Sequence, residues 1–137
     1  MATLAEFHAR QEEDWPRARA ELASGRKTSH WIWWIVPQLA CLGRSDRARH
    51  YGLRDLAEAQ SYLDDPVLRG RLEEVARLVL VQDAPPSDIF GDVDAMKLRS
   101  SMTLFERAQG APKIVSDVLD RCFAGSRCET TLKALED

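Results

Sequence analysis

The sequence lacks the features that would export a protein or hold it in a membrane. Its longest strongly apolar run, from Trp31 to Val36, is six residues long, whereas a membrane-spanning helix needs about 20. The N-terminus shows no basic region followed by an apolar stretch. The three cysteines are an odd number without a Cys-x-x-Cys spacing, which does not indicate a disulfide framework. We therefore expect a cytoplasmic protein with reduced thiols.

Clustered metal ligands and a dominant charge are also missing. The three histidines lie far apart, without a His-Glu-x-x-His or Cys/His grouping, so we expect neither a metal site nor a cofactor. The net charge is -3, from 22 acidic and 19 basic residues, which provides no global field for nucleic acid or an anionic membrane. Both are therefore disfavoured as partners. The alternative for nucleic acid is a local basic patch formed by four arginines, Arg44, Arg47, Arg49 and Arg54.

The composition is that of an ordinary globular protein. At 137 residues, with 45% hydrophobic and 30% charged residues, the chain can form a core without disulfides or metals. No internal repeat or long linker divides it, so we predict one domain over residues 1–137. The sequence does not decide the oligomeric state, and a homo-oligomer stays open.

Apolar periodicity predicts an all-α fold of about seven to eight helices. The clearest helix begins at Asp65-Pro66 and repeats apolar residues at steps of four, three and four up to about Gln82. Its end is rich in β-branched residues, as in a short strand, but the continuous stripe favours helix. Other helices are expected near residues 92–108, near residues 111–124 and from residue 129 onward.

Capping residues predict where the helices of the N-terminal half begin. Asp14 is expected to cap a helix with Pro16 in its first turn and an end near Gly25, after a shorter helix. Ser45 is expected to cap another helix, and Ser29 would cap a helix through the aromatic residues that follow it.

Residues 25–39 bring aromatic and polar side chains together. Three of the four tryptophans fall within residues 31–34, directly behind basic and hydroxyl residues. In one interpretation these tryptophans form the core. In the other, one or two of them line a pocket and stack on a base or ring, with Lys27, His30 or Arg44 near a charged group.

Residues 97–105 place two serines and a threonine inside a predicted helix, where hydroxyl residues are not favoured. Lys97, Ser100 and Ser101 share one face of that helix. This face is either solvated or closely packed, with its hydroxyls bonded to the preceding turn, or it binds an anion. Because Lys97 precedes the serines, the order of Ser-x-x-Lys enzymes is reversed, and we assign no catalytic residue.

Two segments of the sequence resemble the signatures of the DUF1810 family. Residues 25–38 match Gly-x-Lys-x-Ser-His-Trp-x-Trp followed by Pro-Gln, and residues 97–105 match Lys-Leu-x-Ser-Ser-Met-Thr-Leu-Phe. The resemblance covers nearly the whole chain and implies a small, mainly α-helical bacterial domain without an established activity. Some members carry the label calpastatin, but this chain does not resemble a disordered protease inhibitor. Relatives often have histidine at Asp65, so any role of that histidine is absent here.

Because the polar residues belong to both signature segments, we predict that the segments pack together around one pocket. We expect this pocket to bind a small anionic, nucleotide-like ligand, and whether it also catalyses a reaction is left open. The candidate ligand-binding residues are Lys27, Ser29, His30, Trp31, Gln38, Arg44, Lys97, Ser100 and Ser101.

The alternative is a non-catalytic interaction or structural domain. In that case the signature residues build the fold, and an exposed apolar helix face recruits a partner or a second copy. A concave pocket with convergent polar groups would favour the ligand-binding function, whereas a flat apolar patch would favour the protein-interaction function.

Overall fold

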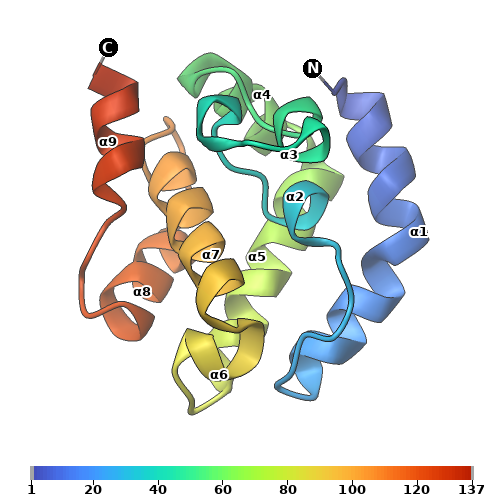
Figure 1. Cartoon of the computed structure of the whole chain (residues 1–137), viewed down its shortest axis with the longest axis vertical. Helices are drawn as coiled ribbons and strands as arrows, with labels where there is room; N and C mark the ends of the chain where they lie inside the picture. Colours follow the sequence, from blue (N-terminus) through green and yellow to red (C-terminus); the bar gives the residue numbers. More distant parts are fainter. Residues whose placement is uncertain (1, 137) are drawn as a thin grey trace.

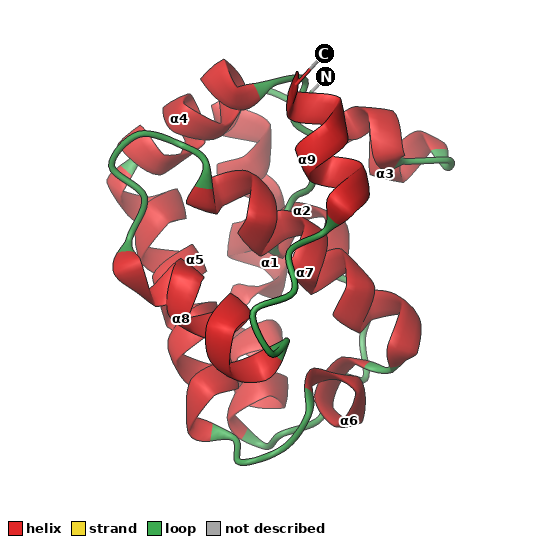
Figure 2. Cartoon of the chain, turned by 90° about the vertical axis from the view of Figure 1, so that its left-hand side faces the viewer, coloured by secondary structure: helices red, strands yellow, loops and turns green. Residues whose placement is uncertain are grey.

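The computed structural model describes residues 2–136, which form helices joined by loops and contain no β-strand (Figure 2). This confirms the predicted all-α fold, with nine α-helices where about seven to eight were expected. No helix of the described part is long and apolar enough to cross a membrane. The elements are α1 (Leu4–Ala23), α2 (Ile32–Ile35), the 3-10 turn η1 (Ala40–Leu42), α3 (Asp46–His50), α4 (Leu56–Asp64), α5 (Pro66–Val81), α6 (Pro86–Phe90), α7 (Asp92–Glu106), α8 (Lys113–Cys122) and α9 (Glu129–Glu136).

Helix α7 lies at the centre of the arrangement. It packs against α4, α6, α8 and α9, and α5 packs between α1 and α8. The short α2 lies between α1 and α7 (Figure 1). Figure 2 shows α8 and α9 on the side of α7 that faces the viewer. The aromatic segment and α7, which carry the two signatures, are therefore direct neighbours.

Helix α5 confirms the clearest prediction from the sequence. Its N-cap is Asp65, whose carboxylate accepts hydrogen bonds from the backbone N–H groups of Val67 and Leu68 at 3.0 and 3.1 Å. The strand-like end of the segment is helical up to Val81. The same Asp65 carboxylate lies 2.7 Å from His8 Nε2, and this hydrogen bond lowers the pKa of Asp65. The apolar stripe is buried and consists of Leu68, Leu72, Val75 and Val79.

The predicted break near Asp14 is wrong, because α1 is one helix of 20 residues that begins at Leu4. Thr3 caps it in a capping box with Glu6, which is a stronger start signal than Asp14. Pro16 lies inside the helix and cannot donate to the carbonyl of Glu12. Both residues are exposed, so water can satisfy that carbonyl.

The aromatic segment is much less helical than predicted. Its helix α2 has only four residues, Ile32–Ile35, and Ser29 does not cap it. Pro37 disfavours a helical conformation at the preceding residue, and Val36 ends the helix with φ -131° and ψ 75°. Trp31 and Trp34 are each 1% exposed, so both belong to the core. The prediction that Ser45 caps a helix is confirmed, since its Oγ accepts from the N–H of Ala48 at 3.1 Å.

The buried Gln11 joins three elements. Its side-chain amide donates to the carbonyl of Trp34 at 2.6 Å and to the hydroxyl of Tyr62 at 2.9 Å. Gln11 and Tyr62 are both fully buried, so no water competes for these groups. Gln11 therefore fixes the positions of α1, α2 and α4 relative to one another.

We predict that Gln11→Met destabilises the protein by roughly 2–4 kcal/mol, because two buried acceptors lose their donor while the side-chain volume is nearly kept. The free energy of unfolding, measured by urea denaturation, checks this. Gln109→Met, at an exposed turn position, is the control and should change the stability by less than about 0.5 kcal/mol. An equal effect of both substitutions would contradict the role given to Gln11.

Candidate functional site

The two signature segments meet at Asp94 in the first turn of α7. Its carboxylate lies 2.8 Å from Lys27 Nζ and 3.2 Å from Lys97 Nζ. The side chain of Lys27 is 5% exposed and also donates to the backbone carbonyl of Ser29 at 2.5 Å. Burial raises the pKa of Asp94, but the hydrogen bonds and charges of the two lysines lower it further than burial raises it. An ionised Asp94 therefore fixes both lysines.

Trp33 is the half-buried member of the tryptophan cluster. Lys97 Nζ lies 4.5 Å from the centroid of its ring, and the guanidinium carbon of Arg47 lies 5.6 Å from it. Cations at such distances are attracted by the electron-rich face of an indole. Lys97 is thus held by the Asp94 carboxylate and by the Trp33 ring.

Trp33 and Lys97 line two surface hollows. Hollow A, of about 360 Å³, has an apolar wall of Ile32, Phe90 and Val93 and a polar part with Lys27 and Asp94. Hollow B, of about 280 Å³, lies beside η1 and the start of α3. In addition to Trp33 and Lys97, hollow B is lined by residues that include Gln38, Leu42, Arg44 and Ala48.

The two hollows differ in charge. In hollow A the charges of Lys27 and Lys97 are balanced by those of Asp92 and Asp94. Hollow B has Arg44 and Lys97, and no carboxylate of the described residues lines it. Arg44 is exposed, and within residues 2–136 its side chain forms neither an ion pair nor a hydrogen bond. Hollow B is therefore the more cationic of the two.

Ser29 and Trp31, which were predicted to line the pocket, bind the carboxylate of Glu21 on α1. Glu21 accepts hydrogen bonds from the N–H groups of Thr28 and Ser29 at 2.7 and 2.9 Å. It also accepts from the Ser29 hydroxyl at 2.6 Å and from the Trp31 indole at 3.1 Å. Burial raises the pKa of Glu21, but these donors lower it to about 2. Both residues are thus used to fasten the aromatic segment to α1.

Ser100 and Ser101 also lie in packing contacts instead of in a hollow. The fully buried Ser101 donates to the carbonyl of Pro37 at 2.7 Å and so holds the end of the aromatic segment against α7. The Ser100 hydroxyl lies 2.8 Å from the hydroxyl of Thr131 on α9. The structure therefore favours close packing as the explanation of these hydroxyls.

Of the nine predicted site residues, five line hollow A or hollow B: Lys27, His30, Gln38, Arg44 and Lys97. Trp33 and Asp94, which also line these hollows, were not among the residues predicted from the sequence. On a helical wheel Trp33 faces away from Trp31, and this difference in direction could have identified Trp33 as the tryptophan that lines a hollow. Asp94 lies one turn before Lys97, so its pairing with that lysine could have been expected, but its contact with Lys27 depends on the tertiary fold.

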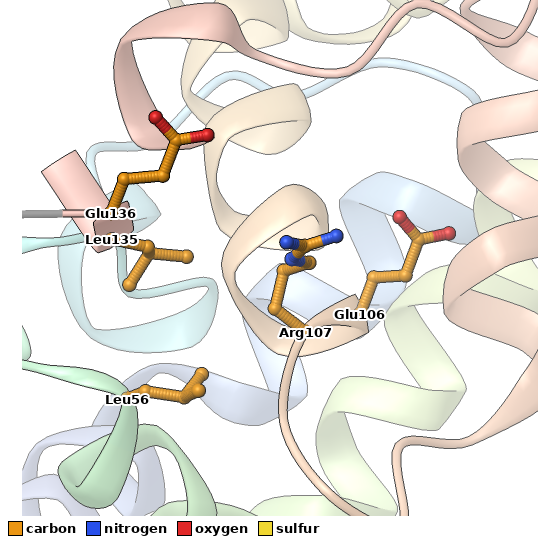
Figure 3. Close-up of a pocket in the computed structure, with 5 residues that line it drawn as sticks. All are labelled: Leu56, Glu106, Arg107, Leu135 and Glu136. Carbon is orange, nitrogen blue, oxygen red and sulfur yellow. The ribbon is translucent and has the colours of Figure 1, made fainter. Parts of the chain in front are cut away.

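Another hollow, of about 400 Å³, lies at the other end of α7 (Figure 3). The carboxylate of Glu106 in this hollow already accepts hydrogen bonds from Arg127 and from the Ser116 hydroxyl. The hollow carries charges of both signs and no signature residue. These features do not favour an anion site there. Its lining residues are Leu56, Glu106, Arg107, Leu135 and Glu136.

Within residues 2–136, no group of three or more His, Cys, Asp or Glu side chains is placed to hold a metal ion. The three cysteines are free. Burial raises the pKa of the Cys122 thiol, which disfavours the reactive thiolate form.

The comparisons with known proteins agree with the resemblance seen in the sequence. A family model described as "Protein of unknown function (DUF1810)" matches residues 1–135. The structure is similar to the crystal structure of the conserved hypothetical protein Rv1873 from Mycobacterium tuberculosis, with a TM-score of 0.94 and 39% sequence identity. That match covers 98% of this chain and 96% of the other. No curated protein matches the chain.

We predict that Glu21 makes the protein sensitive to acid. Its pKa of about 2 lies below its ordinary value of 4.5, so its stabilising contribution is complete above pH 4.5 and is lost as the pH falls toward 2. Glu21→Gln should be less stable than the parent at pH 7, and the difference should narrow by pH 3. Urea denaturation at both pH values measures this difference.

The control is Glu13→Gln, which changes an exposed carboxylate of the same helix. Its stability difference from the parent should be the same at both pH values. A difference for Glu21→Gln that stayed constant from pH 7 to pH 3 would contradict the assignment.

Proposed function

The chain belongs to the DUF1810 family, and we propose that it binds a small anionic ligand in hollow B, between Arg44 and Lys97. One observation carries this proposal. Two cationic side chains from segments far apart in the sequence line the same hollow, and none of its described lining residues is acidic. A concave site with such convergent polar groups is the usual form of a small-molecule site.

The side chains of hollow B have complementary roles toward an anion. The planar guanidinium of Arg44 can donate to two oxygens of a carboxylate or phosphate at once. Lys97 provides a second positive charge, whose position is set by Asp94 and Trp33. The amide of Gln38 can donate a further hydrogen bond. The proposal concerns binding and assigns no catalytic residue.

The position of Lys97 bears on the nucleotide-like ligand considered from the sequence. Trp31 is buried, and the ammonium group of Lys97 lies over the ring of Trp33. A base could stack on that face of Trp33 only after Lys97 had moved away. This arrangement supports recognition of the anionic group in preference to recognition of a ring by stacking.

A second candidate function is an interaction with a partner protein or a second copy of the chain. The supporting observation is that Val93 and Met96 on α7 are 68% and 60% exposed. Two side chains make a smaller apolar surface than the patches of a few hundred Å² that mark protein interfaces. The convergent charges of hollow B therefore carry more weight.

We predict that Arg44→Ala weakens the binding of inorganic phosphate or pyrophosphate at least about tenfold, because a charge-assisted hydrogen bond contributes about 1.5–3 kcal/mol. Isothermal titration calorimetry at constant ionic strength measures the affinity. Arg44 is exposed and forms no described side-chain hydrogen bond or ion pair, so the variant should keep the melting temperature of the unliganded parent.

The matched control is Arg121→Ala, which removes the same charge from an exposed position on α8. It should bind phosphate as the parent does. Equal losses in both variants would indicate a general effect of charge. Parent-like affinity in Arg44→Ala would overturn the proposed site.

A further inference from the structure

We infer that hollow A and hollow B take one ligand together, a small anion that carries an apolar group. The inference rests on the proposed function, since the anionic end lies in hollow B between Arg44 and Lys97. The apolar group extends past Trp33 into hollow A. Both hollows are lined by Trp33 and Lys97, so they adjoin at these two side chains.

The charges of hollow A exclude it as a second anion site. Lys27 and Lys97 are both bound to the carboxylate of Asp94, and Asp92 adds another negative charge to the lining. An anion there would be repelled by the carboxylates of Asp92 and Asp94, which line hollow A but not hollow B. The anionic end of a ligand therefore belongs in hollow B, and its uncharged end fits hollow A.

The walls of hollow A are suited to such an uncharged group. Ile32, Phe90, Val93 and the ring of Trp33 form apolar surface around it. Contact with these side chains would remove apolar surface of the protein and of the ligand from water, which is favourable in proportion to its area.

Two exposed side chains extend this apolar surface. Val93 and Met96 lie three residues apart on α7, and residues at this spacing are neighbours on a helix surface. They are two of the five exposed large hydrophobic residues among those described. An apolar ligand group in hollow A would contact Val93 directly and lie close to Met96. Such a contact would explain why these two apolar side chains are exposed and not buried in the core.

The dimensions of the hollows favour a free small molecule as the occupant. Hollow A measures about 360 Å³ and hollow B about 280 Å³, near the lower end of the range of small-molecule sites. A group of a few carbon atoms beside one phosphate or carboxylate is of this size.

The test uses methyl, butyl and hexyl phosphate, which share one anionic group and differ in apolar length. Calorimetry with the parent protein should show an affinity for butyl phosphate at least about tenfold higher than that for methyl phosphate. The double variant Val93→Ser/Met96→Ser should reduce this gain and keep the affinity for methyl phosphate, because Val93 is one of the apolar side chains that line hollow A. Both substituted side chains are exposed, so the variant should fold as the parent does.

Val81→Ser is the matched control, because Val81 is as exposed as Val93, at 68%, and lies at the end of α5. It should keep the full gain with chain length. If methyl phosphate binds through Arg44 but longer chains bind no more tightly, the inference is overturned and the proposed function stands. An undiminished gain in the double variant would also overturn it.

Two further outcomes of the binding experiments bear on the proposed function and on the kind of partner. If none of the alkyl phosphates and no inorganic phosphate binds, the proposed function fails together with the inference. Binding to vesicles that contain phosphatidic acid, without affinity for soluble hexyl phosphate, would indicate a membrane surface as the partner and would overturn the inference of a free small molecule.

Discussion

The structure depends on satisfying the polar groups of a partly buried segment that is mostly not helical. Residues 25–38 pass between α1 and α7 with a single short helix, so much of their backbone needs hydrogen-bond partners outside the segment. Glu21 supplies them at the start, Gln11 at the carbonyl of Trp34, and Ser101 at the end. Each of these contacts also joins the segment to a neighbouring helix, so the packing of α1, α2 and α7 follows from the same hydrogen bonds.

This requirement explains why polar residues recur in both signatures. A buried hydroxyl or amide is costly when it lacks a partner and stabilising when it has one, which restricts the residue types at such positions. Ser101 is an example, since its fully buried hydroxyl binds the carbonyl of Pro37, and the half-buried hydroxyl of Ser29 is likewise bound by Glu21. The polar character of the signatures is therefore in part a property of the fold, independent of any ligand.

The elements that were predicted correctly are those with local signals. The stripe of α5 and the cap at Ser45 depend on residues within a few positions of each other. The two capping residues that were predicted wrongly, Asp14 and Ser29, are bound by partners distant in the sequence. Asp14 was expected to begin a helix, but its carboxylate accepts from the Trp34 indole at 2.7 Å. Ser29 was expected to cap α2, but its hydroxyl is bound by Glu21, 8 residues earlier. Side chains that can cap a helix can equally serve a buried tertiary contact.

For the candidate site, the sequence identified the two segments that meet. It could not separate the residues of these segments that stabilise the fold from those that could bind a ligand. That separation requires knowing which polar groups the fold already uses. The serines of α7 and Lys27 are occupied by protein partners, whereas Gln38 and Arg44 lie in hollow B without a side-chain partner among the described residues. Lys97 belongs to both groups, because it is bound to Asp94 and also faces hollow B. Two polar side chains that the fold leaves without a side-chain partner, those of Gln38 and Arg44, thus lie with Lys97 in one cationic hollow, and this placement supports the proposed ligand site.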